Sequence, residues 1–269
     1  EALSYAPSVI AMFETDGYSE IPKTEGTVIL GDDFGGVLAK GVTQNIQPLR
    51  DVSLQGIVGA TLEADLLLRR MPLLMRSPDG WMASFGTQLL KAVTGTSTYV
   101  IKTNSNGIEQ VRVKQLNPIP TDSEGRVWVN WVAPKETSLQ EMDVQGKVVI
   151  VGTTAKGILP QVSTPVGLLY PHQIQASLAE TIIHASNKRM PMIPQEAMLY
   201  EAAILLVGML LVFTAINYLG IYLGVLCSFA LISATLTLGY HLVGKGFLVD
   251  VTFAMLSEFI IASATFYVN

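Results

Sequence analysis

The sequence contains very little cysteine or histidine. Its 269 residues include one cysteine, Cys227, and three histidines, His172, His184 and His241. A single cysteine cannot form a disulfide within the chain, and a structural zinc site needs several thiolate or imidazole ligands at set spacings, which these residues lack. We therefore expect no internal disulfide, no metal site and no cofactor.

Basic residues are also scarce. The chain has 17 Lys and Arg against 22 Asp and Glu, which gives a net charge of −5. Nucleic-acid binding requires clustered positive charge, but only Arg69-Arg70 and Lys188-Arg189 are adjacent basic pairs. Both pairs are expected to be solvated surface, so nucleic acid is excluded as a partner.

No catalytic arrangement is visible in the sequence, and no catalytic residue is predicted. The loop Gly152-Thr153-Thr154-Ala155-Lys156-Gly157 has some likeness to a phosphate-binding loop. The spacing does not fit, because the lysine must follow the second glycine and precede Ser or Thr. A plain turn after a strand is the favoured interpretation, and an anion site made of backbone amides is the alternative. Thr153, Thr154, Lys156 and Gly157 are the candidate ligand-binding residues.

Charge is absent from residues 202–244. A membrane-spanning helix needs about 20 apolar residues, and this run has about twice that length. The sequence Asn-Tyr-Leu-Gly at 217–220 divides it, and a third apolar run follows Lys245. We expect three transmembrane helices, at about 197–216, 221–242 and 247–268, with the lipid bilayer as their partner. A soluble buried hairpin is disfavoured, because soluble core helices rarely stay uncharged for so long.

Two acids, Asp250 and Glu258, lie in the third apolar run. Asp250 is expected at the membrane interface, near the start of the helix. Glu258 is near its middle, and an ionisable residue inside a span is a functional candidate. We favour a hydrogen bond from Glu258 to a Ser, a Thr or His241 of a neighbouring helix over a proton relay. Glu258 and His241 are thus the candidate polar residues within the membrane.

Residues 1–190 show alternating strand and helix signals. Short apolar runs at 27–30, 56–61 and 127–131 predict strands, and Asn106-Gly107 predicts a hairpin turn between two further strands. Helical spacing occurs at 82–93 and 173–186. The run Gly-Lys-Val-Val-Ile-Val-Gly at 146–152 has no polar face, which is typical of a buried strand in a parallel sheet. The fold class predicted is an α/β domain followed by the three-helix transmembrane segment.

Three stretches resemble motifs of the CHASE2 domain family. The first combines Gly-Ile-Val-Gly at 56–59 with Glu63-Ala64-Asp65 and the basic-apolar segment 69–73, and the second is Arg-Val-Trp-Val-Asn-Trp at 126–131. The third runs from the apolar segment 145–152 to Thr164-Pro165. The resemblance covers residues 53–268. CHASE2 domains are extracytoplasmic sensor domains of bacterial transmembrane receptors, typically followed by three transmembrane helices.

The resemblance implies a location and a function. Residues 1–190 would be a sensor domain in the periplasm or outside the cell, and residues 197–268 would lie in the bacterial inner membrane. Both ends of the chain look like cut ends. An adenylate or guanylate cyclase or a histidine kinase would follow Asn269, and such an output implies a homodimer. The ligand would be a small molecule or an envelope component.

The sequence also departs from the family pattern. Pro160 stands where an Asp is usual, and Gln173 and Gln175 replace an acid and a histidine. Lys188, Arg189 and Lys245 would lie outside, against the tendency of positive charge to stay in the cytoplasm. An alternative function is therefore a non-enzymatic membrane subunit, in which a CHASE2-like domain is a scaffold for unlike chains.

Overall fold

The computed structural model describes residues 3, 5–17, 26–77, 80–96, 98–131, 144–155, 157–187, 194–245 and 248–268. By its internal contacts the chain divides into two units, Glu1–Pro191 and Met192–Asn269. The first unit is called the domain and the second the helix unit. Each is described by itself.

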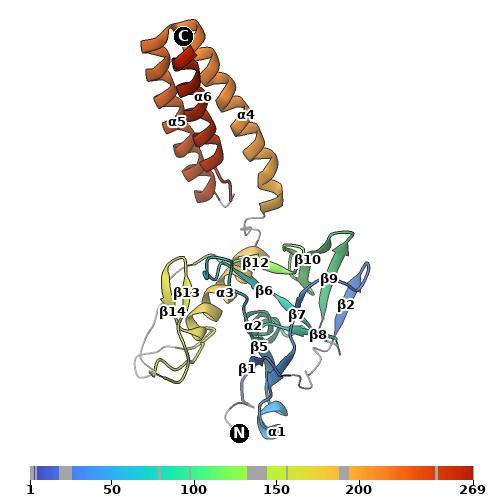
Figure 1. Ribbon diagram of the computed structural model, residues 1–269. Helices are drawn as coiled ribbons and strands as arrows, with labels where there is room; N and C mark the ends of the chain where they lie inside the picture. The colour runs from blue at the N-terminus through green and yellow to red at the C-terminus, as the bar shows by residue number, and fades with distance from the viewer. Residues whose placement is uncertain are drawn as a thin grey trace. The chain divides into compact units, whose positions relative to one another are not determined.

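A small parallel pair of strands lies near the start of the domain. β1 (Val9–Thr15) runs parallel to β5 (Leu54–Val58) and antiparallel to β4 (Gly41–Thr43), and α1 (Gln47–Arg50) connects β4 to β5 (Figure 1). The helix α2 (Phe85–Thr94) packs against β5. Gly56 permits this contact, because a Cβ at that position would lie 2.5 Å from the Cα of Phe85.

The second sheet has the order β11-β10-β9-β2. Its centre is the antiparallel hairpin of β9 (Tyr99–Asn104) and β10 (Gly107–Val113), with β11 (Ile119–Pro120) beside β10 and β2 (Thr27–Leu30) parallel to β9. In the hairpin turn, the Asn106 amide donates to Oδ1 of Asn104 at 2.8 Å, and Gly107 has φ 128°. The hairpin predicted from Asn106-Gly107 is confirmed.

Three smaller sheets complete the domain. β6 (Arg70–Pro72) pairs with β12 (Arg126–Trp128), and β13 (Val162–Thr164) pairs with β14 (Gly167–Leu169). β7 (Leu74–Ser77) lies between β3 (Val37–Leu38) and β8 (Gly80–Ala83). The domain is therefore a mixed α/β fold with several small sheets.

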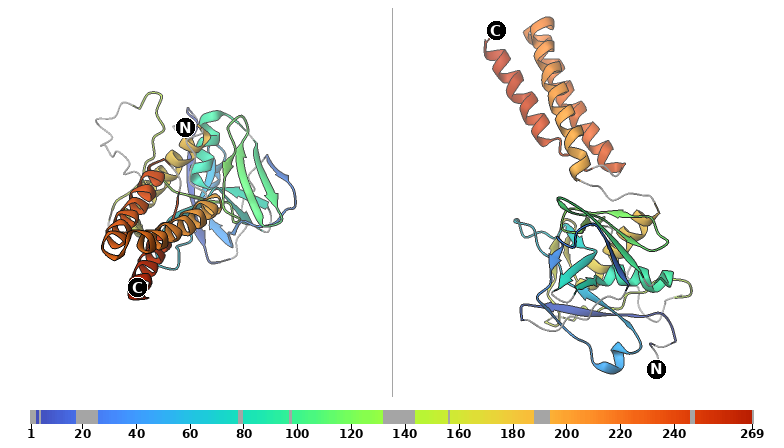
Figure 2. Two further views of the ribbon diagram at one scale, coloured as in Figure 1. Left: turned by 90° about the horizontal axis from the view of Figure 1, so that it is seen from above. Right: turned by 90° about the vertical axis from the view of Figure 1, so that its right-hand side faces the viewer.

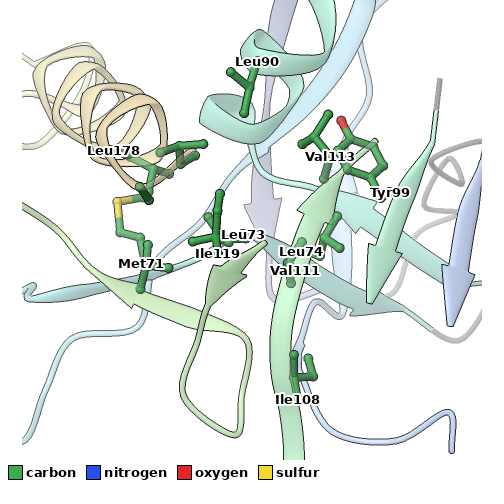
Figure 3. Close-up of a cluster of buried hydrophobic side chains, with 14 of the residues drawn as sticks. Met71, Leu73, Leu74, Leu90, Tyr99, Ile108, Val111, Val113, Ile119 and Leu178 are labelled. Atoms are coloured by element: carbon green, nitrogen blue, oxygen red, sulfur yellow. The ribbon is translucent and has the colours of Figure 1, made fainter. Parts of the chain in front are cut away.

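Two helices cover the core, and both match helical patterns in the sequence. α2 begins at Phe85, three residues later than predicted, because Gly80–Ala83 form β8 and Ser84 caps the helix by accepting from the Thr87 amide at 3.4 Å. α3 (Pro171–Ser186) packs on α2 at Gly86, where a Cβ would lie 3.0 Å from Leu178. Figure 3 shows Leu178 of α3 above Met71, and Leu90 of α2 near Tyr99 and Val113.

The expected buried strand at 146–152 is wrong. The structure gives this segment no strand, and Val148, Val149 and Val151 are 46%, 38% and 77% exposed. An apolar run forms a buried strand only where a neighbouring strand is available to hydrogen-bond with it, and the described residues offer none here. The absence of a polar face did not identify a partner for the segment.

The helix unit contains α4 (Pro194–Leu219), α5 (Ile221–Gly244) and α6 (Thr252–Val268), and each helix packs against the other two (Figure 2). Gly220, with φ 78°, makes the tight turn between α4 and α5. The expected third helix at 247–268 is too long, because α6 begins at Thr252. Asp250 lies before the helix, and its Oδ1 accepts from the Thr252 amide at 2.8 Å.

Two of these helices are long and apolar enough to cross a membrane. The stretches Met198–Leu219 and Tyr222–Val243 each have 22 residues, with mean hydropathies of 2.3 and 1.8, and only 17% of an 18-residue window of each is buried. The third apolar stretch, Thr252–Tyr267, is shorter. The other helices of the unit therefore bury few of the apolar side chains of α4 and α5.

Candidate functional site

The predicted ligand loop lies beside the start of α3. Gly152 packs on the His172 ring so closely that a Cβ would be 2.1 Å from the ring Cγ, and His172 stacks on Tyr170 with ring centres 5.9 Å apart. Thr153 is half-buried, and its Oγ1 accepts from the Ala155 amide at 3.3 Å. Thr154 and Gly157 are exposed. Lys156 lies outside the described residues, so the grouping of the four candidates stays a prediction.

The two glutamines that depart from the family pattern have different surroundings. Gln173 caps α3, because its Oε1 accepts from the Tyr170 amide at 2.7 Å. Gln175 is 2% exposed, and neither atom of its side-chain amide has a hydrogen-bond partner among the described residues. One replacement therefore has a structural role at the helix start, and the other leaves a polar group buried in the domain.

The three CHASE2-like motifs, which are far apart in the sequence, meet in the domain. β6 belongs to the first motif and pairs with β12 of the second, with Arg70 opposite Trp128. The Leu68 amide, next to the first motif, donates to the Ser163 carbonyl at 2.9 Å, directly before Thr164 of the third. Parts of the three motifs thus lie side by side, although the sequence gives no direct sign of it.

Arg70 is the centre of this region. Its Nε and Nη2 donate to the two carboxylate oxygens of Glu63 at 2.7 Å each, and its Nη1 donates to Oδ2 of Asp122 at 2.9 Å. Its guanidinium carbon also lies 5.6 Å from the ring centre of Trp128. Each nitrogen of this guanidinium donates to a carboxylate, so the residue joins segments that are far apart in the sequence.

Asp122 is the second centre, and the sequence interpretation missed it. Its Oδ2 also accepts from Arg126 Nε at 2.9 Å, while its Oδ1 accepts from the amides of Glu124 and Arg126 at 3.1 and 2.9 Å. The signal was the turn Asp-Ser-Glu-Gly at 122–125, where an Asp side chain commonly binds the backbone two residues later. The carboxylate therefore fixes this turn and holds both arginines.

The acids of the region are kept ionised. Hydrogen bonds from Arg70 hold the pKa of Glu63 below its ordinary value, despite some desolvation. The exposed Asp65 forms a two-bond pair with Arg69 at 2.8 and 2.6 Å, and these hydrogen bonds lower the pKa of Asp65 to about 2. Both carboxylates are thus negative at neutral pH, which matches the arginines beside them.

A further perturbed acid, Glu14, lies on β1 near the end of the parallel pair. A Cβ on Gly59, just after β5, would be 2.5 Å from Oε2 of Glu14. Desolvation and the charge of Asp16 raise the pKa of Glu14, while Lys40 opposes the shift. The sequence interpretation missed this residue because it did not identify β1.

One acid lies inside the helix unit. Glu258 of α6 is 0% exposed, and the Thr235 hydroxyl of α5 donates to its Oε1 at 2.9 Å. The expected interhelical hydrogen bond to a Ser, Thr or His is therefore present, with threonine as its donor. His241 is exposed and makes no hydrogen bond or ion pair to Glu258. The two candidate polar residues are not brought together.

Comparison with models of protein families identifies the family of this chain. The model of the CHASE2 domain matches residues 9–215 of the chain. The chain belongs to the CHASE2 family. No curated protein and no solved structure matches it.

CHASE2 domains are extracytoplasmic sensor domains. The match contains all three motifs, so the Arg70 and Asp122 network is part of the CHASE2 domain of this chain. The family match also continues beyond the domain through most of α4, whereas α5 and α6 lie after the end of the match. The sensor family therefore includes the first apolar helix of the helix unit.

Proposed function

We propose that this chain is the sensory input region of a bacterial transmembrane receptor. In this proposal the CHASE2 domain lies outside the cytoplasm and detects a small molecule or an envelope component. The helix unit anchors it in the inner membrane and transmits the signal. The observation that carries the proposal is a sensor domain followed directly by apolar helices whose apolar side chains face outward.

The exposure of α4 and α5 supports their placement in a bilayer. The core helix of a soluble protein is mostly buried, whereas only 17% of an 18-residue window of each of these stretches is buried. At about 1.5 Å per residue, the 26 residues of α4 extend about 39 Å, which exceeds a hydrocarbon core of about 30 Å. The 17 residues of α6 extend about 25 Å, a few ångströms less than that core, and local thinning of the bilayer can accommodate such a difference.

Labelling of single cysteines tests the orientation. In a Cys227→Ser background, Ser105→Cys places a thiol at the tip of the β9–β10 hairpin, and Tyr218→Cys places one at the turn between α4 and α5. A membrane-impermeant maleimide added to intact spheroplasts should label position 105. Position 218 should react only after permeabilisation. The reverse pattern would overturn the extracytoplasmic placement of the domain.

We further propose that an adenylate or guanylate cyclase or a histidine kinase follows Asn269 in the full reading frame. Such outputs work as dimers, so the receptor would be a homodimer. Mass measurement of the full-length particle in detergent tests this, because two copies are expected. A monomer carrying such an output would contradict the receptor proposal.

A second candidate function is a scaffold subunit that holds unlike membrane proteins. One observation favours it: Val148, Val149 and Val151 form an exposed apolar run, and such runs commonly mark interaction sites. In this case the same mass measurement would find one copy of the chain with other polypeptides. A reading frame that stops near Asn269 would also favour the scaffold.

A further inference from the structure

One residue from each helix of the helix unit meets at a single polar contact. Glu258 comes from α6, Thr235 from α5 and Gly208 from α4. The Thr235 hydroxyl donates to Glu258 Oε1 at 2.9 Å, while Oε2 is buried without a hydrogen-bond partner in the described part of the chain. A Cβ on Gly208 would lie 2.0 Å from Oε1 and 2.9 Å from Cδ of Glu258. The carboxyl group therefore occupies space that only glycine leaves open.

The remaining buried contacts of the helix unit are mostly apolar. Val212 and Ile216 of α4 and Ala254 of α6 are almost completely buried. Such contacts specify helix register weakly, because neighbouring apolar residues can replace one another. In a bilayer they also lack a hydrophobic driving force relative to lipid. A single buried polar group, by contrast, can fix register and partner, because every other register leaves it without its partner.

The contact depends on hydrogen bonding and shape, and no opposite charge takes part. The other charged residues of the helix unit whose side chains the structure describes are Glu201, Lys245 and Asp250, and none of them contacts Glu258. Asp250 instead donates its backbone amide to Oε1 of Glu201 at 2.8 Å. The only described donor to Glu258 is the neutral hydroxyl of Thr235. A neutral side chain of the same shape should therefore be able to replace the glutamate.

We propose that Glu258 is the positioning residue of α6. Its hydrogen bond to Thr235, in the space left by Gly208, fixes the depth and rotation of α6 against α4 and α5. α6 is the helix that leads to the end of the chain, so in a receptor its position is the one that an output domain would sense. This last consequence rests on the proposed function, whereas the positioning itself depends only on the helix unit.

Crosslinking between α4 and the segment before α6 measures this positioning. In the full chain with Cys227→Ser, the substitutions Glu201→Cys and Asp250→Cys place thiols where Asp250 and Glu201 are in contact. A short bifunctional thiol reagent should join them in detergent. Glu258→Gln should retain the crosslinked fraction, because glutamine keeps the acceptor oxygen and the shape. Glu258→Leu should reduce that fraction several-fold.

The matched control is Ser263→Leu, which makes a similar polar-to-apolar change on an exposed part of α6. It should leave the crosslinked fraction unchanged. Equal crosslinking with Glu258→Leu and with the reference would overturn the proposal. A crosslinked fraction for Glu258→Gln as low as that for Glu258→Leu would contradict a neutral hydrogen bond at this site. Neither result depends on the orientation of the domain, which the maleimide experiment tests separately.

A second pair of variants keeps the test decisive if Glu258→Leu misfolds. Gly208→Ala should lower the crosslinked fraction, because its Cβ overlaps the Glu258 carboxyl. Adding Glu258→Ala should restore part of it, because the space of the carboxyl becomes free for that Cβ. A double variant no better than Gly208→Ala would contradict the fit between Gly208 and Glu258.

Discussion

The domain and the helix unit distribute apolar and charged side chains in opposite ways. In the domain, Leu73 and Leu74 are 0% exposed, whereas Asp65 and Glu124 pair with arginines at the surface. In the helix unit, Leu206 and Leu210 are 62% and 63% exposed, whereas Glu258 is 0% exposed. The difference supports the proposal that the two units face different solvents, water for the first and hydrocarbon for the second.

The comparison also shows how each unit obtains a specific arrangement. The domain joins distant segments with a network of charges in which Arg70 and Asp122 each have several partners. In the helix unit, an interhelical hydrogen bond between side chains joins Thr235 to the buried Glu258. The domain therefore uses a network of paired charges, whereas the buried polar contact at Glu258 is a neutral hydroxyl bonded to an acid.

The largest expected effect comes from the domain core. Leu74→Ala should lower the free energy of unfolding of the domain by about 2–5 kcal/mol, because the site is fully buried and a cavity remains. The same change at Leu210, on the exposed side of α4, should leave the domain unfolding transition unchanged. Denaturant unfolding followed by tryptophan fluorescence reports on the domain, because Trp81, Trp128 and Trp131 all lie there. Equal losses in the two variants would remove the distinction between the units.

The next effect concerns the charge network. Asp122→Ala should lower the free energy of unfolding of the domain by about 2–4 kcal/mol. The substitution leaves Arg70 and Arg126 without a shared carboxylate that is only 14% exposed. Glu109→Ala is the matched control, since Glu109 pairs with Lys102 at a site where the side chains are 40% and 44% exposed. Exposed pairs contribute about 0–1 kcal/mol. A similar cost for both variants would show that the network has no special role.

A smaller effect distinguishes two acids by pH. The pKa of Glu63 is lowered in the folded domain, so its stabilising effect is complete above its ordinary value of 4.5 and is lost as pH falls through the folded value. The pKa of Glu14 is raised, so its effect is present below 4.5 and is lost as pH rises through the folded value. Glu63→Gln should therefore destabilise more at pH 6 than at pH 3, and Glu14→Gln should become relatively more stable as pH rises. Thermal unfolding across this range measures both, and parallel pH profiles would contradict the assignment.

The smallest effect is at Leu66, in the loop of the first motif. Leu66 has φ 64°, a left-handed conformation that costs an ordinary residue about 1–2 kcal/mol, and its side chain is 68% exposed. Leu66→Gly should therefore stabilise the domain by up to about 1 kcal/mol, after the greater flexibility of unfolded glycine is included. Leu62→Gly, at a position with no positive φ, should destabilise it. A loss of stability in both glycine variants would show that the Leu66 conformation is not strained.

Local patterns were sufficient to predict part of the fold. The Asn106-Gly107 turn, the helical spacing of α3 and the apolar runs of α4 and α5 all depend on residues close in the sequence, and each element is present. The run at 146–152 failed because a strand requires a partner that its own residues do not specify. α6 began late because Asp250 binds the Thr252 amide and starts the helix there.

The candidate region was predictable only in its parts. The motif residues around Arg70 and Arg126 were recognised, but they meet only because β6 pairs with β12. Asp122, which binds both arginines, is 52 residues from Arg70 in the sequence. Glu14 was missed with β1, because the burial that raises its pKa depends on the folded surroundings of that strand. Glu258 was found because a charge within an apolar run is visible without any structure, whereas its need for Gly208 is not.

The most direct test of the two-solvent account is the extraction of the full chain from membranes. Cells expressing the chain are lysed, and the membranes are washed with alkaline carbonate, which removes peripheral proteins. The account predicts that the chain stays in the membrane pellet and is released only by detergent. Recovery of the intact chain in the carbonate supernatant would contradict it, because helices with such exposed apolar faces would then be stable in water.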